Sequence, residues 1–228
     1  GATQRRIGVR KGCAAGPLPG QTLVVLDPAL MMITEVIPCE DAYAQERSMT
    51  PEILQLAAPS DLWIADRNFC TGRLLFGIAE RKAFCLIRQH ARNVVWKAAG
   101  SRISCGSYER GAVFDQKVTL LHEGKTLAAR RITVKLRSAT RDGDRKIHLL
   151  TNLPPSVPAM QLAETYRNRW KLETAFQEMT VDLKCEVNTL GYPRAALFAF
   201  CLAAVAYNVL STAKAALRAA HGHTLIEE

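Results

Sequence analysis

The segment from residue 94 to residue 150 is the feature that most constrains the fold, because it contains strand patterns and no helix pattern. Runs rich in Val, Ile, Thr and Leu follow one another there, among them AVFDQKVTLL and TLAARRITVKL, and the turn sequence HEGK separates these two. Consecutive strands joined by short turns pair in antiparallel fashion. The sequence therefore predicts a continuous block of antiparallel sheet.

The segments on either side of this block mix strands and helices. Before it, the patterns predict a hairpin at 21–38 broken at Asp27-Pro28, a helix at 40–57 with a break before Pro51, a strand at 61–66, a helix at 71–82 and a strand at 83–90. After it, Ser156 can cap a helix that runs to about Met179, and a second long helix follows Pro193. This order predicts an α/β layer with an antiparallel β insertion.

Composition limits the class of protein and its partners. A chain of 228 residues that is 48% hydrophobic can form one domain with a substantial core. Its net charge of +9 favours a polyanionic partner, nucleic acid first and an acidic membrane second. The seven cysteines are scattered without a C-x-x-C pair, which indicates free thiols in a reducing compartment. The apolar run at 195–210 has 16 residues, short of the roughly 20 that span a bilayer, so we expect a buried core helix.

Asp66 is the first candidate for chemistry. The sequence LWIAD places it at the carboxyl end of a short apolar strand, where open α/β sheets have their functional sites. The alternative is a turn or helix-capping aspartate, since Arg67 and Asn68 follow it directly.

The second candidate is the stretch YRNRWKLETAF at 166–176. On one helix, Tyr166, Arg169, Glu173 and Phe176 fall on one side, and Lys171, Thr174, Ala175 and Glu178 face away. A carboxylate on an otherwise apolar side needs a cation or a metal, and Arg169 lies one turn before Glu173. The alternative is a structural Arg–Glu pair. Together, the carboxylates of Asp66 and Glu173 can hold a divalent metal while a guanidinium grips a phosphate.

The segment from Lys125 to Lys146 is strongly basic. Its eight Lys and Arg residues against two Asp residues give a charge of +6. We expect Arg130, Arg131, Lys135 and Arg137 to contact a DNA backbone. The alternative is a solvated sheet face whose charges protect edge strands from aggregation. Trp96 and Tyr108 can stack on an unpaired base or pack in the core.

Several of these segments together resemble one family. The pattern Y-x2-R-x3-E, formed by Tyr166, Arg169 and Glu173, resembles the signature of DDE transposases of the insertion-sequence-four group. IADRNFC at 64–70 resembles the segment that carries the family's second catalytic aspartate. TNLP before the helix and AVAYNVL in the helix after it also match, so the resemblance extends from the hairpin to about residue 218.

This resemblance implies a fold and a chemistry. The fold is an RNase H-like mixed sheet flanked by helices, in a single catalytic domain over 1–228 that is incomplete at its N-terminus, with a β-rich insertion at 91–152 between the second catalytic Asp and the Glu. The chemistry is two-metal phosphoryl transfer with Mg²⁺ or Mn²⁺ held by Asp66 and Glu173. Tyr166 and Arg169 would position the backbone of the transposon end.

The resemblance also implies partners and a compartment. The substrates would be double-stranded DNA at the terminal inverted repeats and at the target, and the enzyme would act as a homodimer in a synaptic complex. We therefore expect a cytoplasmic, nucleoid-associated protein without a membrane partner.

Two positions depart from the family pattern. The lysine expected seven residues after Glu173 is Thr180, and Lys184 lies too far along the helix to inherit its role. The family's first aspartate lies on a strand before the hairpin, whereas Asp27 precedes Pro28 in a turn-like sequence. We therefore expect that strand before Gly1, and weak metal binding without cleavage by residues 1–228 alone. Two alternatives remain: a non-catalytic DNA-binding remnant, and an interaction domain in which Arg169 and Glu173 only pair.

Overall fold

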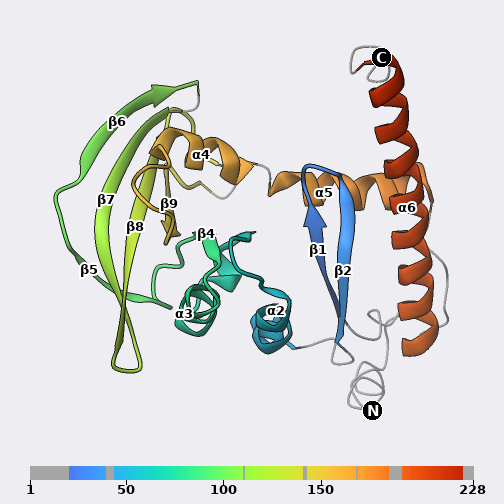
Figure 1. Cartoon of the computed structure of the whole chain (residues 1–228), viewed down its shortest axis with the longest axis horizontal. Helices are drawn as coiled ribbons and strands as arrows, with labels where there is room; N and C mark the ends of the chain where they lie inside the picture. Colours follow the sequence, from blue (N-terminus) through green and yellow to red (C-terminus); the bar gives the residue numbers. More distant parts are fainter. Residues whose placement is uncertain are drawn as a thin grey trace. The chain divides into compact units, whose positions relative to one another are not determined.

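The structure is a computed structural model that describes residues 21–39, 44–109, 111–140, 143–167, 169–184 and 192–222. The chain divides into two compact units (Figure 1). One unit comprises Gly1–Gln45 with Trp170–Glu228, and the other comprises Glu46–Arg169. Each unit has its own sheet and its own helices, and each is described by itself below.

The unit formed by Glu46–Arg169 contains a seven-stranded sheet. Its path runs β3-β4-β9-β8-β7-β5, and β6 also pairs with β7. β3 and β4 are parallel and every other pair is antiparallel, which gives a mainly antiparallel sheet with a parallel edge. The strands are β3 (Leu62–Ala65), β4 (Phe84–Arg88), β5 (Val95–Ala98), β6 (Ile103–Tyr108), β7 (Gly111–His122), β8 (Lys125–Leu136) and β9 (Lys146–Thr151).

The hairpin of β7 and β8 is paired along its whole length. Glu123 and Gly124 connect the two strands and both have positive φ, at 47° and 75°. A two-residue turn with positive φ at both positions matches the right-handed twist of the strands it joins. The sequence HEGK thus forms the turn that its composition predicts.

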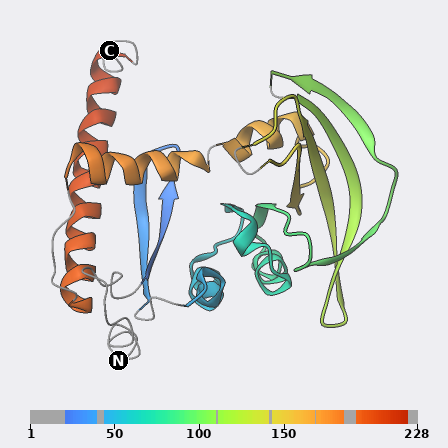
Figure 2. The same cartoon turned by 180° about the vertical axis from the view of Figure 1, so that it is seen from behind.

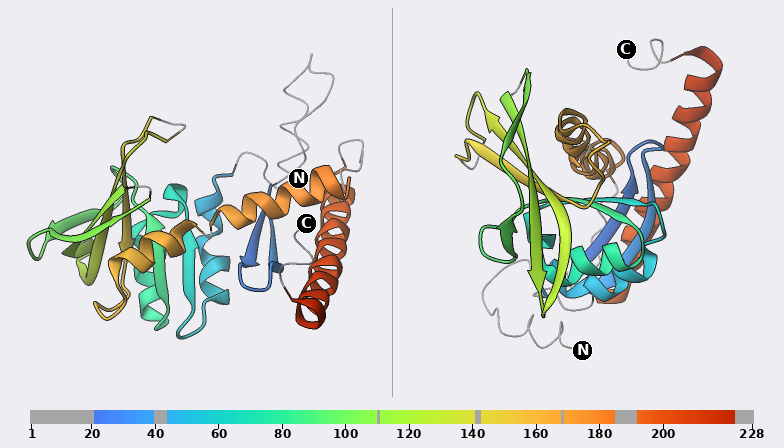
Figure 3. Two further views of the ribbon diagram at one scale, coloured as in Figure 1. Left: turned by 90° about the horizontal axis from the view of Figure 1, so that it is seen from above. Right: turned by 60° about the vertical axis from the view of Figure 1, so that its left-hand side comes forward.

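Helices lie on both faces of this sheet (Figures 2 and 3). The side chains of a strand alternate between faces, so Val113 packs beneath α4 while His122 points to the other face and contacts Phe76 of α3. Helices and 3₁₀ turns here are η1 (Glu46–Met49), α2 (Thr50–Leu56), η2 (Arg67–Phe69), α3 (Gly72–Glu80) and α4 (Ala159–Arg167). The mixed α/β fold class predicted from the sequence, with a mixed sheet flanked by helices, is confirmed.

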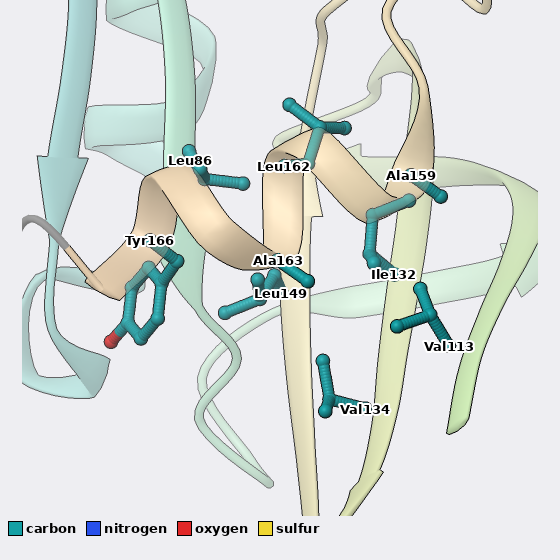
Figure 4. Close-up of a cluster of buried hydrophobic side chains, with 9 residues drawn as sticks. All are labelled: Leu86, Val113, Ile132, Val134, Leu149, Ala159, Leu162, Ala163 and Tyr166. Carbon is teal, nitrogen blue, oxygen red and sulfur yellow. The ribbon is translucent and has the colours of Figure 1, made fainter. Parts of the chain in front are cut away.

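The core beneath α4 fixes the position of that helix (Figure 4). Ala159, Leu162, Ala163 and Tyr166 recur at helical spacing and all face the sheet. The strands supply Leu86, Val113, Ile132, Val134 and Leu149. This packing places the last turn of α4, with Tyr166, against the end of the sheet where β4 lies.

The second unit combines a hairpin with three helical segments. The elements are β1 (Gln21–Asp27), β2 (Met32–Cys39), α5 (Trp170–Gln177), the π-helix η3 (Glu178–Asp182) and α6 (Pro193–His221). Asn208 of α6 joins the helix to β2: its amide nitrogen donates to the Ile33 carbonyl at 2.8 Å, and its oxygen accepts from the Ile33 N–H at 2.8 Å. The core contains Val24, Ile33, Ala175, Met179, Ala203, Ala204 and Tyr207.

Two expectations about helices were wrong. The predicted single helix from Ser156 to Met179 is two helices, because α4 ends at Arg167 and α5 begins at Trp170. The prediction that Glu173 lies on the apolar side of this helix and Ala175 faces away is wrong as well, because Ala175 is buried and Glu173 is exposed. The prediction of one domain over 1–228 with an insertion at 91–152 stays a prediction.

The long apolar helix α6 was expected to be a buried core helix, but only one side of it is buried. Ala203, Ala204 and Tyr207 face the core, whereas Phe198, Leu202 and Val209 are exposed. Within the described residues, α6 alone has the length and apolar composition to cross a bilayer. That is weak evidence, because long apolar helices of soluble proteins have the same properties.

Candidate active site

Asp66 lies at the carboxyl edge of the parallel strands. The register pairs Ala65 with Ile87, so Asp66 and Arg88 are neighbours at the ends of β3 and β4. Alternation places both on the face of Ile64 and Leu86, which is the face that α4 covers. The Asp66 Oδ1 atom accepts from the Asn68 N–H at 2.8 Å and caps η2. Since no hydrogen bond in the described part of the chain uses Oδ2, the capping role leaves one oxygen available for a cation.

Tyr166 brings the end of α4 to the same place. Its side chain is only 8% exposed, and burial raises the pKa of its hydroxyl to about 12. The positive charges of Arg169 and Arg88 and a hydrogen bond with Arg169 lower that pKa, and the charge of Asp66 raises it, without reversing the effect of burial. The structure therefore brings Asp66, Tyr166 and Arg169 together, although a hundred residues separate the first from the others. The hydroxyl stays protonated at neutral pH.

Two residues of this edge escaped the sequence analysis. The Arg88 Nη2 atom lies 2.5 Å from Asp144 Oδ2, and the Arg67 Nη1 atom lies 4.0 Å from the same oxygen. Asp144 belongs to the connection between β8 and β9. Arg88 could have been predicted as a site residue from its place at the end of an apolar strand. Asp144 could not, because its pairing depends on strand order across 56 residues.

Glu173 lies in the first turn of α5, in the other unit, and its side chain is exposed. The expectation of a buried carboxylate there was wrong, because the helix break turns Ala175 to the core. The convergence of Glu173 with Asp66 stays a prediction. Within the described residues, no three Asp, Glu, His or Cys side chains are grouped to hold a metal.

Asp27, weighed as the missing third carboxylate, has a structural role. Its Oδ1 atom accepts from the N–H groups of Ala29 at 2.7 Å and Leu30 at 3.2 Å. These are the hydrogen bonds of an Asx turn between β1 and β2. Asp27 therefore stabilises the hairpin turn, as its position before Pro28 predicts.

The structure departs from the expected DNA contact at Arg130. This residue is 5% exposed, and its Nε and Nη2 atoms donate to Asp115 Oδ2 at 3.0 and 2.6 Å. Its Nη1 atom donates to the carbonyls of Pro154 at 2.8 Å and Val157 at 2.9 Å. Because even-numbered residues of β8 point toward α4, Arg130 anchors the connection between β9 and α4 instead of facing solvent.

The opposite face of β8 is basic. The Arg131 guanidinium lies 4.7 Å from the centre of the Trp96 ring, and its Nε donates to Gln89 at 2.7 Å. Lys135 is exposed on the same face, and Arg137 is exposed beyond the end of the strand. Burial, then the charges of Arg131, Lys146 and Arg102, lower the pKa of His148 on this face to about 4. We call Arg102, Arg131, Lys135 and Lys146 the basic face.

The aromatic candidates have roles inside the protein. Trp96 supports Arg131 by stacking, and Tyr108 packs against the core beneath α4. Both positions agree with the packing alternative more closely than with a stacked base.

The family model described as "Transposase DDE domain" matches residues 21–209, from β1 into α6. No curated protein matches the chain. The matched span includes Asp66, Tyr166, Arg169 and Glu173.

Proposed function

The chain belongs to the transposases with a DDE domain, and from this premise we propose that it is the catalytic domain of an enzyme of the insertion-sequence-four group. The family implies nuclease chemistry in DNA transposition and recombination. The proposed reaction is phosphoryl transfer at transposon ends, first cleavage and then strand transfer. The observation that carries the proposal is that Asp66 follows β3 on the face of the sheet that α4 covers, where α4 brings Tyr166 and, directly after it, Arg169.

Asp66 and Glu173 are the proposed ligands of Mg²⁺ or Mn²⁺. A carboxylate at a strand end suits a hard divalent cation, and in Asp66 one oxygen accepts no hydrogen bond from the described residues. When bound, a pair of such ions would supply activation of the attacking oxygen and stabilisation of the leaving oxygen. The described carboxylates provide two ligands, so for residues 1–228 alone we propose weak metal binding and no strand cleavage.

Tyr166 and Arg169 are the proposed positioning residues for the DNA backbone. The Tyr166 hydroxyl is neutral at physiological pH and lies close enough to Arg169 for the charge of the arginine to lower its pKa, and its proposed role is to orient the guanidinium. An oriented guanidinium can hold a phosphate with two parallel hydrogen bonds. Such a contact sets the position of the scissile phosphate without reading base sequence.

The basic face and Arg137 are a second proposed DNA contact. Their cations form no ion pair among the described residues, and after burial the charges of Arg131, Lys146 and Arg102 lower the pKa of His148. We propose contacts to backbone phosphates from Arg131, Lys135 and Arg137, which leaves Arg130 out of the set. A homodimer that pairs two transposon ends is part of the same proposal.

A non-catalytic DNA-binding remnant is the second candidate. Thr180 replaces the family lysine, and its hydroxyl donates within the helix to the carbonyls of Phe176 at 3.0 Å and Gln177 at 3.3 Å. Thr180 therefore has no charge to offer a phosphate. A remnant would keep DNA binding and lose metal-dependent chemistry.

Calorimetric titration with Mn²⁺ separates these candidates. We expect Asp66→Asn and Glu173→Gln each to weaken Mn²⁺ binding by roughly tenfold, because each removes a ligand charge. Asp61→Asn is the matched control: Asp61 also caps a backbone N–H, that of Ala58 at 2.9 Å, and loses the same charge. If the wild type and all three variants bind Mn²⁺ with equal affinity, the result supports the second candidate, a non-catalytic DNA-binding remnant. Robust cleavage of a blunt or nicked duplex by Asp66→Asn in Mg²⁺ would refute the catalytic assignment.

A further inference from the structure

Two guanidinium groups converge on one carboxylate oxygen beside the proposed active site. Arg88 lies 2.5 Å from Asp144 Oδ2 and Arg67 lies 4.0 Å from it. Arg67 follows Asp66 directly, and Arg88 is close enough to Tyr166 to lower the pKa of its hydroxyl. The oxygen of Asp144 therefore lies beside two arginines, of which one follows the metal-ligand candidate Asp66 in the chain and the other influences the hydroxyl of Tyr166.

This arrangement has the donors of a phosphate site. Arginine binds phosphate and carboxylate oxygens with the same fork of N–H groups, so one anion can replace the other. The side chains of Asp144 and Arg67 are 41% and 48% exposed, so a ligand can reach them from solvent. Arg88 itself is only 19% exposed, so an incoming phosphate would reach its guanidinium from the side of the more exposed Asp144.

Asp144 is held in place by its backbone rather than by Arg88. Its N–H donates to Thr140 Oγ1 at 3.1 Å, and its carbonyl accepts from the Thr140 N–H at 2.9 Å. Gly143, with φ at 82°, donates its N–H to the Thr140 carbonyl at 2.9 Å. The carboxylate is thus presented to Arg88 by a closed turn that does not depend on the ion pair.

We propose that Arg88 binds a DNA phosphate in this site, and that Asp144 is an internal competitor that occupies the guanidinium until DNA displaces it. The inference rests on the proposed function, because it assumes that DNA lies at the edge that carries Asp66. A single small anion gains little by replacing Asp144, whereas a duplex brings many phosphates and releases counterions as it binds. The pair therefore favours polyanions over small anions.

Anisotropy of a labelled 30-base-pair duplex of mixed sequence, without divalent metal, tests the proposal. We expect Asp144→Asn to bind roughly fivefold more tightly than wild type and Arg88→Gln roughly fivefold more weakly, since each changes one phosphate contact. Arg88→Gln combined with Asp144→Asn should show no gain over Arg88→Gln. Asp144→Asn keeps the turn, because the hydrogen bonds to Thr140 use backbone atoms of Asp144.

Glu80→Gln is the matched control. Glu80 forms a similar surface ion pair with Lys125 at 2.7 Å, so this variant changes the net charge by the same amount without freeing Arg88. We expect it to bind the duplex like wild type. If Asp144→Asn behaves like Glu80→Gln while all bind DNA, the competitor role is overturned and the proposed function stands.

A second measurement tests directly whether Arg88 binds phosphate, even if the protein does not bind the duplex. Inorganic phosphate titrated into ¹⁵N-labelled protein should shift the Arg88 Nε resonance saturably, at lower concentration in Asp144→Asn than in wild type. If no variant binds duplex, the proposed function fails. The absence of a saturable phosphate shift in Asp144→Asn then overturns the inference about Arg88 as well.

Discussion

Neighbouring arginines of β8 have opposite roles because strand geometry separates them. Arg130 points toward α4, where it binds Asp115 and two backbone carbonyls. Arg131 points to the basic face, where it stacks on Trp96. A charge count along the sequence treats the two as equivalent. The alternation of side chains across the sheet makes one of them structural and leaves the other for a ligand.

Arg130→Met should destabilise the protein strongly. Asp115 Oδ1 is buried without a hydrogen-bond partner among the described residues, so loss of Arg130 leaves its carboxylate uncompensated. Breaking a buried pair on one side costs about 3–5 kcal/mol of unfolding free energy. Urea denaturation measures this value. The double variant with Asp115→Leu should recover part of the lost stability. A cost below about 1 kcal/mol for the single variant would contradict the structural role of the Arg130–Asp115 pair.

His148 reports the potential of the basic face. Its folded pKa of about 4 lies below the usual 6.5, so its contribution to stability is present above pH 6.5 and is lost as the pH falls through 4. NMR titration should therefore find this imidazole neutral at pH 5. Duplex DNA bound to the basic face should raise the pKa of His148, because phosphates offset the charges of Arg131, Lys146 and Arg102. A pKa unchanged by bound DNA would place the contact elsewhere.

Tyr166 should make stability depend on pH at the alkaline end. Its folded pKa of about 12 exceeds the usual 10, so its contribution is present below pH 10 and is lost as the pH rises through 12. Replacement by Phe should flatten the stability profile in this range, as measured by chemical denaturation at each pH.

The helical elements show where sequence patterns stop being informative. The stretch 156–179 keeps a helical period throughout, and between Arg167 and Trp170 it contains no Pro or Gly that would mark an end. The break is visible only in the fold, where the Arg169 N–H donates to the Tyr166 carbonyl at 3.2 Å in a tightened last turn. Packing against two different cores, and not helix propensity, divides the segment.

A side chain at Gly124 should destabilise the turn of the β7–β8 hairpin. A Cβ there meets nothing within 4 Å, so the cost of Gly124→Ala comes only from its positive φ of 75°. We expect a loss of about 1–2 kcal/mol in unfolding free energy. Gly100→Ala is the control, because its Cβ would make ordinary contact with Lys117 at 3.6 Å. Equal melting temperatures for both variants would argue against a strained turn.

At the scale of the whole molecule, the family signature crosses the boundary between the two units. Tyr166 and Arg169 belong to one unit and Glu173 to the other. The residues at strand and helix ends could be predicted from the sequence, because local patterns mark those ends. Arg88 with Asp144, and the burial of Arg130, could not, because they depend on the order and pairing of strands distant in sequence.

The join between the units should therefore be sensitive to insertion. One glycine inserted between Arg169 and Trp170 lengthens the connection between α4 and α5 by one residue, which is up to about 3.6 Å of chain, and so can displace Glu173 from Arg169. We expect Mn²⁺ affinity to fall to the level of Glu173→Gln, with duplex binding by the basic face unchanged. An insertion variant with the Mn²⁺ affinity of wild type would show that Glu173 is not a ligand shared with Asp66.

The amide of Asn208 closes the side of β2 that faces away from β1. By binding both backbone groups of Ile33, it takes the place that a neighbouring strand would occupy beside β2. Enlargement of this two-stranded sheet next to Ile33 is thereby blocked, and a third strand has to join along β1.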